Sequence, residues 1–331
     1  MPGEVPRFSI ARTVPVYFSI VPTSASDARW DVVGLGANAV DFVYRLPAVP
    51  QATGNFSKMR ISRETISCGG QMTTALVACA RFGLRAKYIG ATGTDDNGRR
   101  IRRELAHHSV DCTDAIIKDA RNQYAVIMVD EVTGERIVLW DRDEKLHLRP
   151  HEIPERAIVS ARLLHVDDVD QEAAIVAGEI ARNAGLVVTS DIDRLTPRTA
   201  DLVKAVTVPI FAEHVPTGLT GSKDIGSALR QLRELHPGLL CATIGAEGAI
   251  ALDGDRLVHS PGFKVQAVDT TGAGDVFRAG FIYGTLQGWS TELVLRFANA
   301  AAGLSCTRAG AIGGVPALEE IESLLETAPA S

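Results

Sequence analysis

The amino-acid sequence predicts an α/β fold: a central, mostly parallel β-sheet flanked by helices, with a small additional β-sheet. Beyond residue 150, short apolar runs alternate with amphipathic stretches, which is typical of strand–helix units that build a parallel sheet. Before residue 150, alternating stretches separated by glycine-rich turns indicate a second, smaller sheet. With 331 residues, of which 46% are apolar, the chain is long enough to bury a large core.

The first half of the chain supplies the small sheet. Its extended stretches are expected at 31–36, 40–46, 58–67, 123–129 and 136–140. Thr133-Gly134 lies between the last two and indicates a hairpin, while Pro47 ends the second. We therefore expect one large domain over residues 30–331, with a small sheet built from about 40–67 and 121–141. Residues 1–29 are expected to be a loose N-terminal extension.

The elements of the large sheet follow from periodicity and turn residues. Gly70 to Phe82 carries small and apolar residues at helical spacing, which predicts a helix packed closely on a sheet. Asp253-Gly254 is a two-residue hairpin signal that places antiparallel strands at the sheet edge. Further strands are expected at 163–166, 186–189 and 239–243, and further helices at 172–183, 225–235, 273–286, 292–304 and 318–325.

Composition limits the classes of partner and the compartment. The net charge of −6 gives no overall basic field, so we expect neither a nucleic-acid nor a membrane partner. No segment approaches the roughly 18 apolar residues that a membrane-spanning helix needs. The cysteines are odd in number and widely spaced, which disfavours a disulfide framework or a zinc site and favours a reducing cytoplasm. They are Cys68, Cys79, Cys112, Cys241 and Cys306.

A glycine-rich turn carries the clearest chemical signal. Thr270-Thr-Gly-Ala-Gly-Asp275 opens a predicted helix, so its unpaired backbone amides and the helix dipole favour an anion. The amides of Gly272, Ala273 and Gly274 could surround a transferring phosphoryl group, and Asp275 is placed to accept a proton from an attacking hydroxyl. Taken alone, the same turn could be an ordinary helix start in which Asp275 only satisfies first-turn amides.

The wider context of this turn resembles a known family. Asp269 to Phe281, with Phe277 and Gly280 at fixed spacing, is similar to the C-terminal signature of the ribokinase-like (PfkB-type) carbohydrate kinases. Five further stretches match in the family's order: 34–41, 68–83, 89–98, 242–248 and 299–311. The resemblance implies a ribokinase-like fold whose small sheet is a lid. It also implies an ATP-dependent phosphotransferase acting on a hydroxyl of a ketose, pentose or sugar acid, with Asp275 as the general base.

The resemblance also implies an acceptor site near the lid. Asn38 and Asp41 offer amide and carboxylate groups for vicinal hydroxyls, and Gly69 and Gly70 would let substrate oxygens approach backbone amides. Thr74 stands where the family usually has asparagine, so one sugar contact is altered or missing. The lid would add Gln123, Trp140 and Arg142.

Arg142 has two interpretations. An arginine near the acceptor could favour a substrate that bears a carboxylate or another anion. It could equally be a solvated charge on an edge strand. The sequence leaves both open.

The nucleotide and the cations are assigned by the same resemblance. Positions around ATP are Thr243, Gly245, Gly248 and Asn299, and those of a K⁺ loop found in many relatives are Asp269, Thr271, Ser305, Arg308 and Gly310. The Asn-x-x-Glu motif that orders Mg²⁺ in many relatives is lost, since Ala212 and Val215 occupy its ends. We expect Mg²⁺ to be held mostly by ATP and water, with help from Glu213.

Several alternatives stay open. Gly34-Leu-Gly36-Ala-Asn-Ala39 also fits a dinucleotide-binding fingerprint, although a strand pattern follows where that motif needs a helix. His165-Val-Asp167-Asp168-Val-Asp170 could be a metal site or a solvated loop. The chain could be a nucleoside kinase, or a sensor that binds sugar or nucleotide without catalysis. Because the lid edges invite pairing, we also expect a homodimer through the lid.

Overall fold

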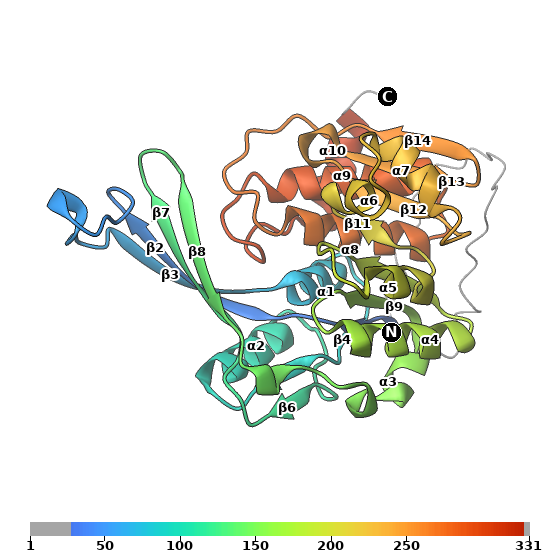
Figure 1. The fold of residues 1–331 in the computed structure, drawn as a ribbon, viewed down its shortest axis with the longest axis horizontal. Helices are drawn as coiled ribbons and strands as arrows, with labels where there is room; N and C mark the ends of the chain where they lie inside the picture. Colours follow the sequence, from blue (N-terminus) through green and yellow to red (C-terminus); the bar gives the residue numbers. More distant parts are fainter. Residues whose placement is uncertain (1–27, 328–331) are drawn as a thin grey trace.

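Short apolar runs form the strands of the main sheet in the computed structural model, which describes residues 28–327 (Figure 1). These strands are β1 Trp30–Leu35, β4 Ala86–Tyr88, β9 Ala161–Asp167, β10 Val187–Asp191, β11 Ile210–Phe211, β12 Leu240–Thr243, β13 Ala249–Asp253 and β14 Arg256–Ser260. Their order is β10-β9-β1-β4 in one half and β11-β12-β13-β14 in the other. Parallel bridges from Thr189 to Val208 and from Ile192 to Phe211 connect the halves. Strand β13 pairs antiparallel with both of its neighbours, β12 and β14, and its pairing with β14 is the hairpin that Asp253-Gly254 predicts.

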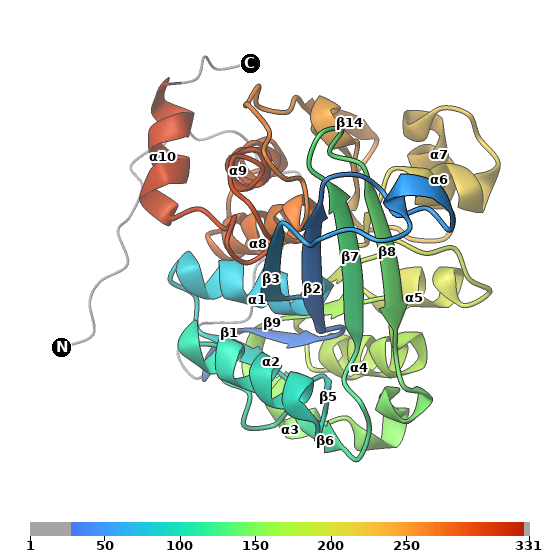
Figure 2. The same ribbon diagram turned by 90° about the vertical axis from the view of Figure 1, so that its left-hand side faces the viewer.

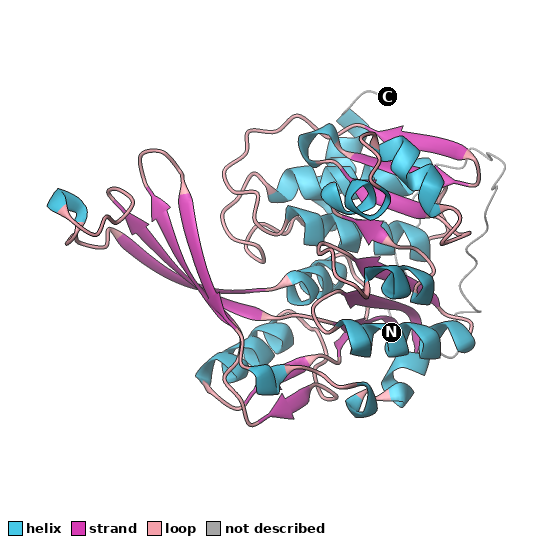
Figure 3. Cartoon of the chain, in the orientation of Figure 1, coloured by secondary structure: helices cyan, strands magenta, loops and turns pink. Residues whose placement is uncertain are grey.

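Helices cover both faces of this sheet because neighbouring residues on a strand point to opposite faces (Figure 3). Val32 lies in the core of one face and Val33 in the core of the other. The first face is covered by α1 Gln71–Arg81, α2 Asp96–His107, α8 Ala273–Leu286, α9 Thr291–Ser305 and α10 Leu318–Thr327. The second face is covered by α3 Glu155–Val159, α4 Gln171–Asn183, α5 Thr199–Ala205, α6 His214–Thr220 and α7 Ile225–Leu232. The predicted parallel sheet flanked by helices is thereby confirmed.

A separate small sheet projects from the main body (Figures 1 and 2). It consists of β2 Ala39–Leu46, β3 Arg63–Gly69, β7 Tyr124–Asp130 and β8 Arg136–Asp141, in the order β3-β2-β7-β8. Asp41 pairs with Ala125, and Ala125 pairs with Trp140. Directly paired residues share a face of a sheet, so Asp41 and Trp140 lie on the same face. A short pair, β5 Ala91–Gly93 and β6 Ile116–Lys118, completes the strands.

The chain leaves the main sheet for the small sheet after β1, and it returns to the main body at the start of α1. Ala37 and Asn38 connect β1 to β2, and Gly70 connects β3 to α1. Gly70 has φ +95°, and a Cβ atom there would stand 2.6 Å from the Cα atom of Asn38. A side chain would therefore clash with the backbone of the other crossing. The two crossings are packed against each other through this glycine.

The extended stretch predicted over 58–67 is too long. Strand β3 begins only at Arg63, and the last contact before it is the Ser62 amide on the Arg45 carbonyl oxygen, at 2.9 Å. The partner strand β2 ends at Leu46, where Pro47 stops it, so residues before Ser62 have no ladder to join. Earlier in the same connection between β2 and β3, Gly54–Phe56 forms a 3₁₀ turn.

Other expectations can be compared directly. The dinucleotide-binding alternative is wrong, because the residues after Gly36 enter strand β2 and not a helix. The helix expected at 225–235 ends at Leu232. The N-terminal extension predicted for residues 1–29 lies, except for its last two residues, outside the described residues. Between residues 28 and 327, no helix has the length and apolar character needed to cross a membrane.

Candidate active site at the junction of the two sheets

The turn predicted to bind the transferring phosphoryl group, Thr270 to Asp275, lies at the N-terminus of α8 and is called the transfer turn below. Gly272 is its N-cap with φ +80°, and a Cβ atom there would stand 2.8 Å from the Cβ atom of Ala311. The Ala273 amide donates to the Thr270 carbonyl oxygen at 3.3 Å. The amides of Gly272 and Gly274 have no acceptor among the described residues. Two backbone donors at a helix N-terminus are therefore available to an anion.

Asp275 follows this turn in the first turn of α8 and is partly buried. Burial raises the pKa of its carboxyl well above the ordinary value, and the charges of Asp191 and Asp167 raise it further. Arg278 and the hydroxyl of Thr74 act in the opposite direction. A carboxylate with a raised pKa binds a proton more readily than a solvated one, as a general base must.

The four predicted nucleotide residues line one cavity of about 670 Å³. Thr243 is the last residue of β12, Gly245 and Gly248 follow it, and Asn299 lies on α9. Ala273 and Gly274 of the transfer turn line the same cavity, so the cavity reaches the start of α8, where the Gly274 amide has no acceptor among the described residues. The volume is within the range of small-molecule sites. The structure thus brings the nucleotide residues and the transfer turn together.

The sequence reasoning missed the other walls of this cavity. They come from the loop after β14 and from one face of α9, namely Gly262, Phe263, Lys264, Val265, Ala267, Ala302, Gly303 and Cys306. The Asn299 amide donates to the Ser260 carbonyl oxygen at 2.8 Å and so holds this loop at the cavity. Ala302 and Gly303 stand three and four positions after Asn299, a helical spacing that could have indicated them.

Asp41 of β2 and the glycines at the end of β3, Gly69 and Gly70, are the residues predicted for the acceptor site. Burial raises the pKa of Asp41 to about 6. A Cβ atom on Gly69 would stand 3.0 Å from an Asp41 carboxylate oxygen, so this glycine admits the carboxylate. Thr74 is fully buried on α1, and its hydroxyl has no hydrogen-bond partner of ordinary length among the described residues. Its methyl group lies 3.3 Å from the Cβ position of Gly272, which places Thr74 against the transfer turn.

The side-chain amide of Asn38 forms hydrogen bonds within the protein at both its nitrogen and its oxygen. Asn38 is 3% exposed, and its side-chain amide nitrogen donates to the Tyr88 hydroxyl at 2.6 Å and to the Ala91 carbonyl oxygen at 2.7 Å. Its amide oxygen accepts from the Asn122 amide at 2.8 Å. These bonds fix the bend between β1 and β2 and join it to the segment that leads into β7. In this structure Asn38 positions the strand that carries Asp41.

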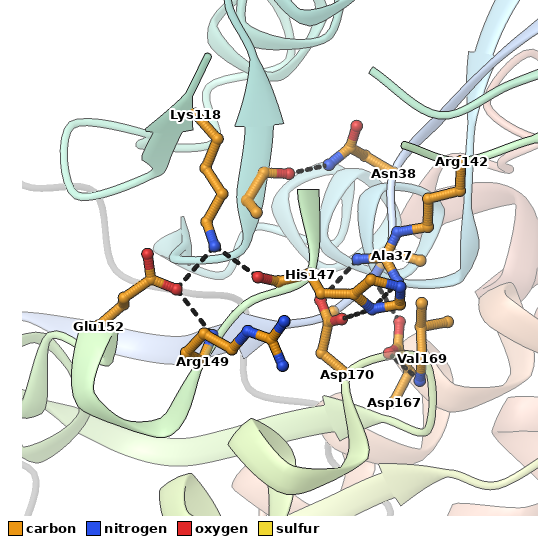
Figure 4. Close-up of polar contacts among 12 residues, drawn as sticks. Ala37, Asn38, Lys118, Arg142, His147, Arg149, Glu152, Asp167, Val169 and Asp170 are labelled. Carbon is orange, nitrogen blue, oxygen red and sulfur yellow. Dashed lines mark hydrogen bonds and ion pairs between the residues drawn. The ribbon is translucent and has the colours of Figure 1, made fainter. Parts of the chain in front are cut away.

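Arg142 is paired at the base of the small sheet. Its Nη2 atom lies 2.7 Å from an Asp170 oxygen, and His147 Nδ1 lies 3.1 Å from the other oxygen (Figure 4). The side chain of Arg142 is 9% exposed, so this is neither a solvated edge charge nor a free cation. Trp140 is 69% exposed on the face that carries Asp41. The carbonyl oxygen of Gln123 accepts from the Val40 amide at 3.1 Å.

The predicted cation loop is held together by Asp269. Its two carboxylate oxygens accept from the amides of Thr271 at 2.9 Å and Gly310 at 2.8 Å. Burial would raise the pKa of Asp269, but these hydrogen bonds outweigh burial and lower it. A Cβ atom on Gly314 would lie within 3 Å of the carbonyl oxygens of both Ser305 and Gly310, so these oxygens converge.

Arg308 and Glu213 are not among the residues that line the nucleotide cavity. Arg308 pairs with Glu320 of α10, at 3.2 Å between Nη1 and a carboxylate oxygen. Glu213 is exposed immediately before α6. Val215, at the position of the lost glutamate, is fully buried.

The acidic cluster after β9 holds loops. Asp167 accepts from the amides of Ala37 at 2.6 Å and Val169 at 3.0 Å (Figure 4). Asp168 accepts from the Arg194 amide, and Asp170 pairs with Arg142. Among residues 28–327, no three histidine, cysteine or acidic side chains are grouped to bind a metal ion.

Comparison with known proteins gives one family. The model of the pfkB family carbohydrate kinases matches residues 37–318. An ATP-dependent ribose-1-phosphate kinase of Halopiger xanaduensis is 30% identical, over 87% of this chain and 92% of that protein. A nucleoside kinase of Methanothermobacter thermautotrophicus is 28% identical, over 86% and 92%. A 5-dehydro-2-deoxygluconokinase of Bacillus subtilis is 26% identical, over 92% and 98%.

Solved structures share the ribokinase-like fold. A ribokinase of Thermotoga maritima aligns with a TM-score of 0.79 and 21% identity, over 90% of this chain and all of that chain. A ribokinase of Arabidopsis thaliana, complexed with ribose and ATP, aligns with the same TM-score and identity, over 90% and 99%.

Proposed function

Because this chain belongs to the pfkB family of carbohydrate kinases, we propose that it transfers the γ-phosphoryl group of ATP to a hydroxyl of a sugar, with Asp275 as the general base. The chain is a carbohydrate kinase. The observation that supports the finer proposal is the junction at Gly274, where the amides of the transfer turn meet both the nucleotide cavity and Asp275. A base and an anion hole are thus adjacent to a cavity of nucleotide size.

The proposed step is an in-line displacement. The acceptor oxygen forms a bond to the γ-phosphorus while the bond to the ADP oxygen breaks, and Asp275 takes the hydroxyl proton. The amides of Gly272, Ala273 and Gly274 bind the charge on the phosphoryl oxygens, after the long Ala273 hydrogen bond is exchanged for the anion. Thr243, Gly245, Gly248 and Asn299 hold the nucleotide.

The cations are assigned by the chemistry of the available donors. Since the described residues form no acidic cluster for a divalent ion, Mg²⁺ would be held by the nucleotide phosphates and water, with help from Glu213 after β11. When bound, it offsets the charge of the phosphates. K⁺ would be held by oxygens of the Asp269 loop, which the resemblance assigns to Asp269, Thr271, Ser305, Arg308 and Gly310; the carbonyl oxygens of Ser305 and Gly310 both lie close to Gly314.

The acceptor is proposed to bind between Asp41, Gly69, Gly70 and Thr74, beneath the small sheet. The buried Thr74 hydroxyl faces the Asp275 carboxyl and has no hydrogen bond of ordinary length among the described residues, so an acceptor hydroxyl could bind between the two. The small sheet, from about 40–67 and 121–141, would close over this site as a lid, with Gln123, Trp140 and Arg142 near it. Within the domain proposed for residues 30–331, a ketose, a pentose or a sugar acid all remain candidate acceptors.

Two rival functions follow from particular observations. A nucleoside kinase is favoured by the exposed Trp140, whose indole could stack on a base. A non-catalytic sensor is favoured by the buried, paired state of Arg142 and by the lost magnesium motif. The available amides beside Asp275 oppose the sensor, because a sensor needs no base. We further propose a cytoplasmic enzyme, since all five cysteines are unpaired.

Asp275→Asn tests the proposal against both rivals. ADP release would be measured with a panel of sugars, sugar acids, sugar phosphates and nucleosides, in the presence of Mg²⁺ and K⁺. We expect one sugar class to stimulate release, and the variant to reduce kcat at least about 100-fold while ATP still binds. Stimulation by nucleosides alone would favour the first rival. ATP binding without stimulation by any acceptor would favour the sensor.

A further inference from the structure

A buried ion pair lies directly beneath the transfer turn. Arg278 stands one helical turn after Asp275 on α8, and its Nη2 atom lies 2.7 Å from an oxygen of Asp191, at the end of β10. Both side chains are 4% exposed. Removing two charges from water is costly, and a buried pair is often no more stabilising than apolar residues of similar volume. Packing alone therefore gives little reason for an arginine at this position.

The same guanidinium supports the backbone of the turn. A Cβ atom on Gly274 would stand 2.8 Å from Arg278 Nη1, so the guanidinium packs directly against a glycine that lines the nucleotide cavity. Arg278 Nε has no hydrogen-bond partner among the described residues. The arginine thus contacts Gly274 on one side and Asp191 on the other.

The charges around Asp275 come from several elements. Asp191 on β10 and Asp167 on β9 face it as carboxyls, and Thr74 on α1 faces it with a hydroxyl. Arg278 on α8 is the cation among the groups that act most strongly on it. Asp191 is itself faced by further groups, namely Asp168, Asp193 and Gln71. His165 on β9 adds no positive charge at neutral pH, because burial and Arg278 lower its pKa to about 3.

We propose that Arg278 is a positioning residue of phosphoryl transfer: held by Asp191, it fixes the backbone at Gly274 and supplies the positive charge that keeps Asp275 able to accept a proton. The inference rests on the proposed function of Asp275. Arg278 acts through Gly274 and Asp275 and does not touch the substrate, because its side chain is almost fully buried. The charge of Asp191 raises the pKa of Asp275, whereas the charge of Arg278 lowers it. Variants of the two residues should therefore have opposite effects on the pKa of Asp275.

The two single variants should move the pH profile in opposite directions. In Arg278→Met the pKa of Asp275 rises, so the acidic limb of kcat moves to higher pH by about one unit or more, and the rate on that limb falls roughly tenfold. In Asp191→Asn the pKa of Asp275 falls, so the limb moves to lower pH. A role limited to packing would lower the melting temperature in both variants without opposite shifts.

Conservative and matched variants complete the design. Arg278→Lys keeps the charge and should retain the wild-type limb, while the double variant Arg278→Met/Asp191→Asn should place the limb between those of the single variants. Arg162→Met is the matched control, because Arg162 pairs with Asp31 and its Nη2 donates to the Leu286 carbonyl oxygen at the far end of α8. It should cost stability and leave the pH profile unchanged.

The outcomes that contradict the inference differ from those that contradict the proposed function. If wild type is active and both single variants keep its limb, or shift it in the same direction, the inference is overturned. Failure of wild type to use any acceptor would instead contradict the proposed function. In that case the Asp275 carboxyl would be titrated by ¹³C NMR, assigned with Asp275→Asn, where opposite shifts support the inference and equal pKa values overturn it.

Discussion

Four carboxyl groups near the junction of the two sheets differ in what surrounds them. Burial raises the pKa of Asp41 to about 6 and that of Asp167 to about 7, although two backbone amides oppose the shift at Asp167. At Asp269 the amide hydrogen bonds outweigh burial and lower the pKa. Asp275 has a raised pKa, is partly accessible and stands beside available amides. Asp41 is also partly exposed and has a raised pKa, so the available amides beside Asp275 are what distinguish it as the candidate base.

His165 gives a prediction for stability against pH. It is 1% exposed, its Nδ1 atom lies 2.9 Å from the Thr189 hydroxyl, and burial lowers its pKa to about 3. Below the unfolded pKa of about 6.5, the unfolded chain binds a proton that the folded protein rejects, so stability is lost as pH falls. This one group should cost about 2 kcal/mol between pH 7 and pH 5.

Urea unfolding of wild type and His165→Gln at both pH values measures this contribution. The variant loses some stability at pH 7, and we expect its deficit relative to wild type to shrink by about 2 kcal/mol at pH 5. Asp167 has the opposite pH dependence but is present in both proteins, so it cancels. A deficit that is the same at both pH values would show that His165 does not titrate in this way.

The elements that carry the site are joined by polar contacts at the base of the small sheet. Asn38 connects the bend after β1 to Asn122, which precedes β7. Arg142 connects the end of β8 to Asp170, which precedes α4. Asp167 at the end of β9 holds the Ala37 amide. Because several buried polar groups depend on one another here, loss of one partner should affect the whole base of the sheet.

Gly70 and Gly83 form a matched pair for testing the crossing. Both have positive φ, +95° and +87°, but a Cβ atom on Gly83 meets nothing within 4 Å, whereas one on Gly70 meets Asn38 backbone at 2.6 Å. Gly83→Ala should cost only the left-handed strain, roughly 1–2 kcal/mol of unfolding free energy. Gly70→Ala should cost at least about 3 kcal/mol, because two backbone segments must separate. Urea unfolding gives both values, and equal costs would contradict the close crossing.

At the scale of the whole molecule, the small sheet exposes apolar side chains far from the main core. Its face opposite to Asp41 carries Ile66, Ile137 and Leu139, whose side chains are 38%, 37% and 53% exposed. Exposed sheet edges and apolar faces invite pairing. We propose that two copies of the chain associate through this sheet.

Sedimentation analysis of Leu139→Lys tests the association. Wild type is expected to sediment with twice the chain mass of 35.3 kDa, and the variant with the mass of one chain. Val159→Lys is the control, because Val159 is 50% exposed on α3 in the main body. Leu139→Lys should also lose activity if pairing of the two chains orders the small sheet over the acceptor, whereas Val159→Lys should not. A wild-type protein that sediments as a single chain would exclude the homodimer.

The order of strands and helices could be predicted because it depends on local patterns. The helix over 273–286 agrees residue for residue, since Gly272 precedes it and its apolar spacing is regular. The start of β3 could not be predicted, because an extended stretch becomes a strand only where a partner exists, and β2 ends at Leu46. The walls of the nucleotide cavity after β14 were missed because Gly262 to Val265 form no regular element with a readable period.

The sequence by itself determined the family and the transfer turn, because the signature from Asp269 to Phe281 is continuous and its glycines and aspartate act through local backbone geometry. Only the tertiary structure decided that Arg142 is paired with Asp170, that the Asn38 amide is occupied by the scaffold, and that Arg278 and Asp191 meet beneath Gly274. The physical reason is that each of these contacts joins segments tens of residues apart. Their distances and burial, which set the cost of a charge, exist only after the sheets have assembled.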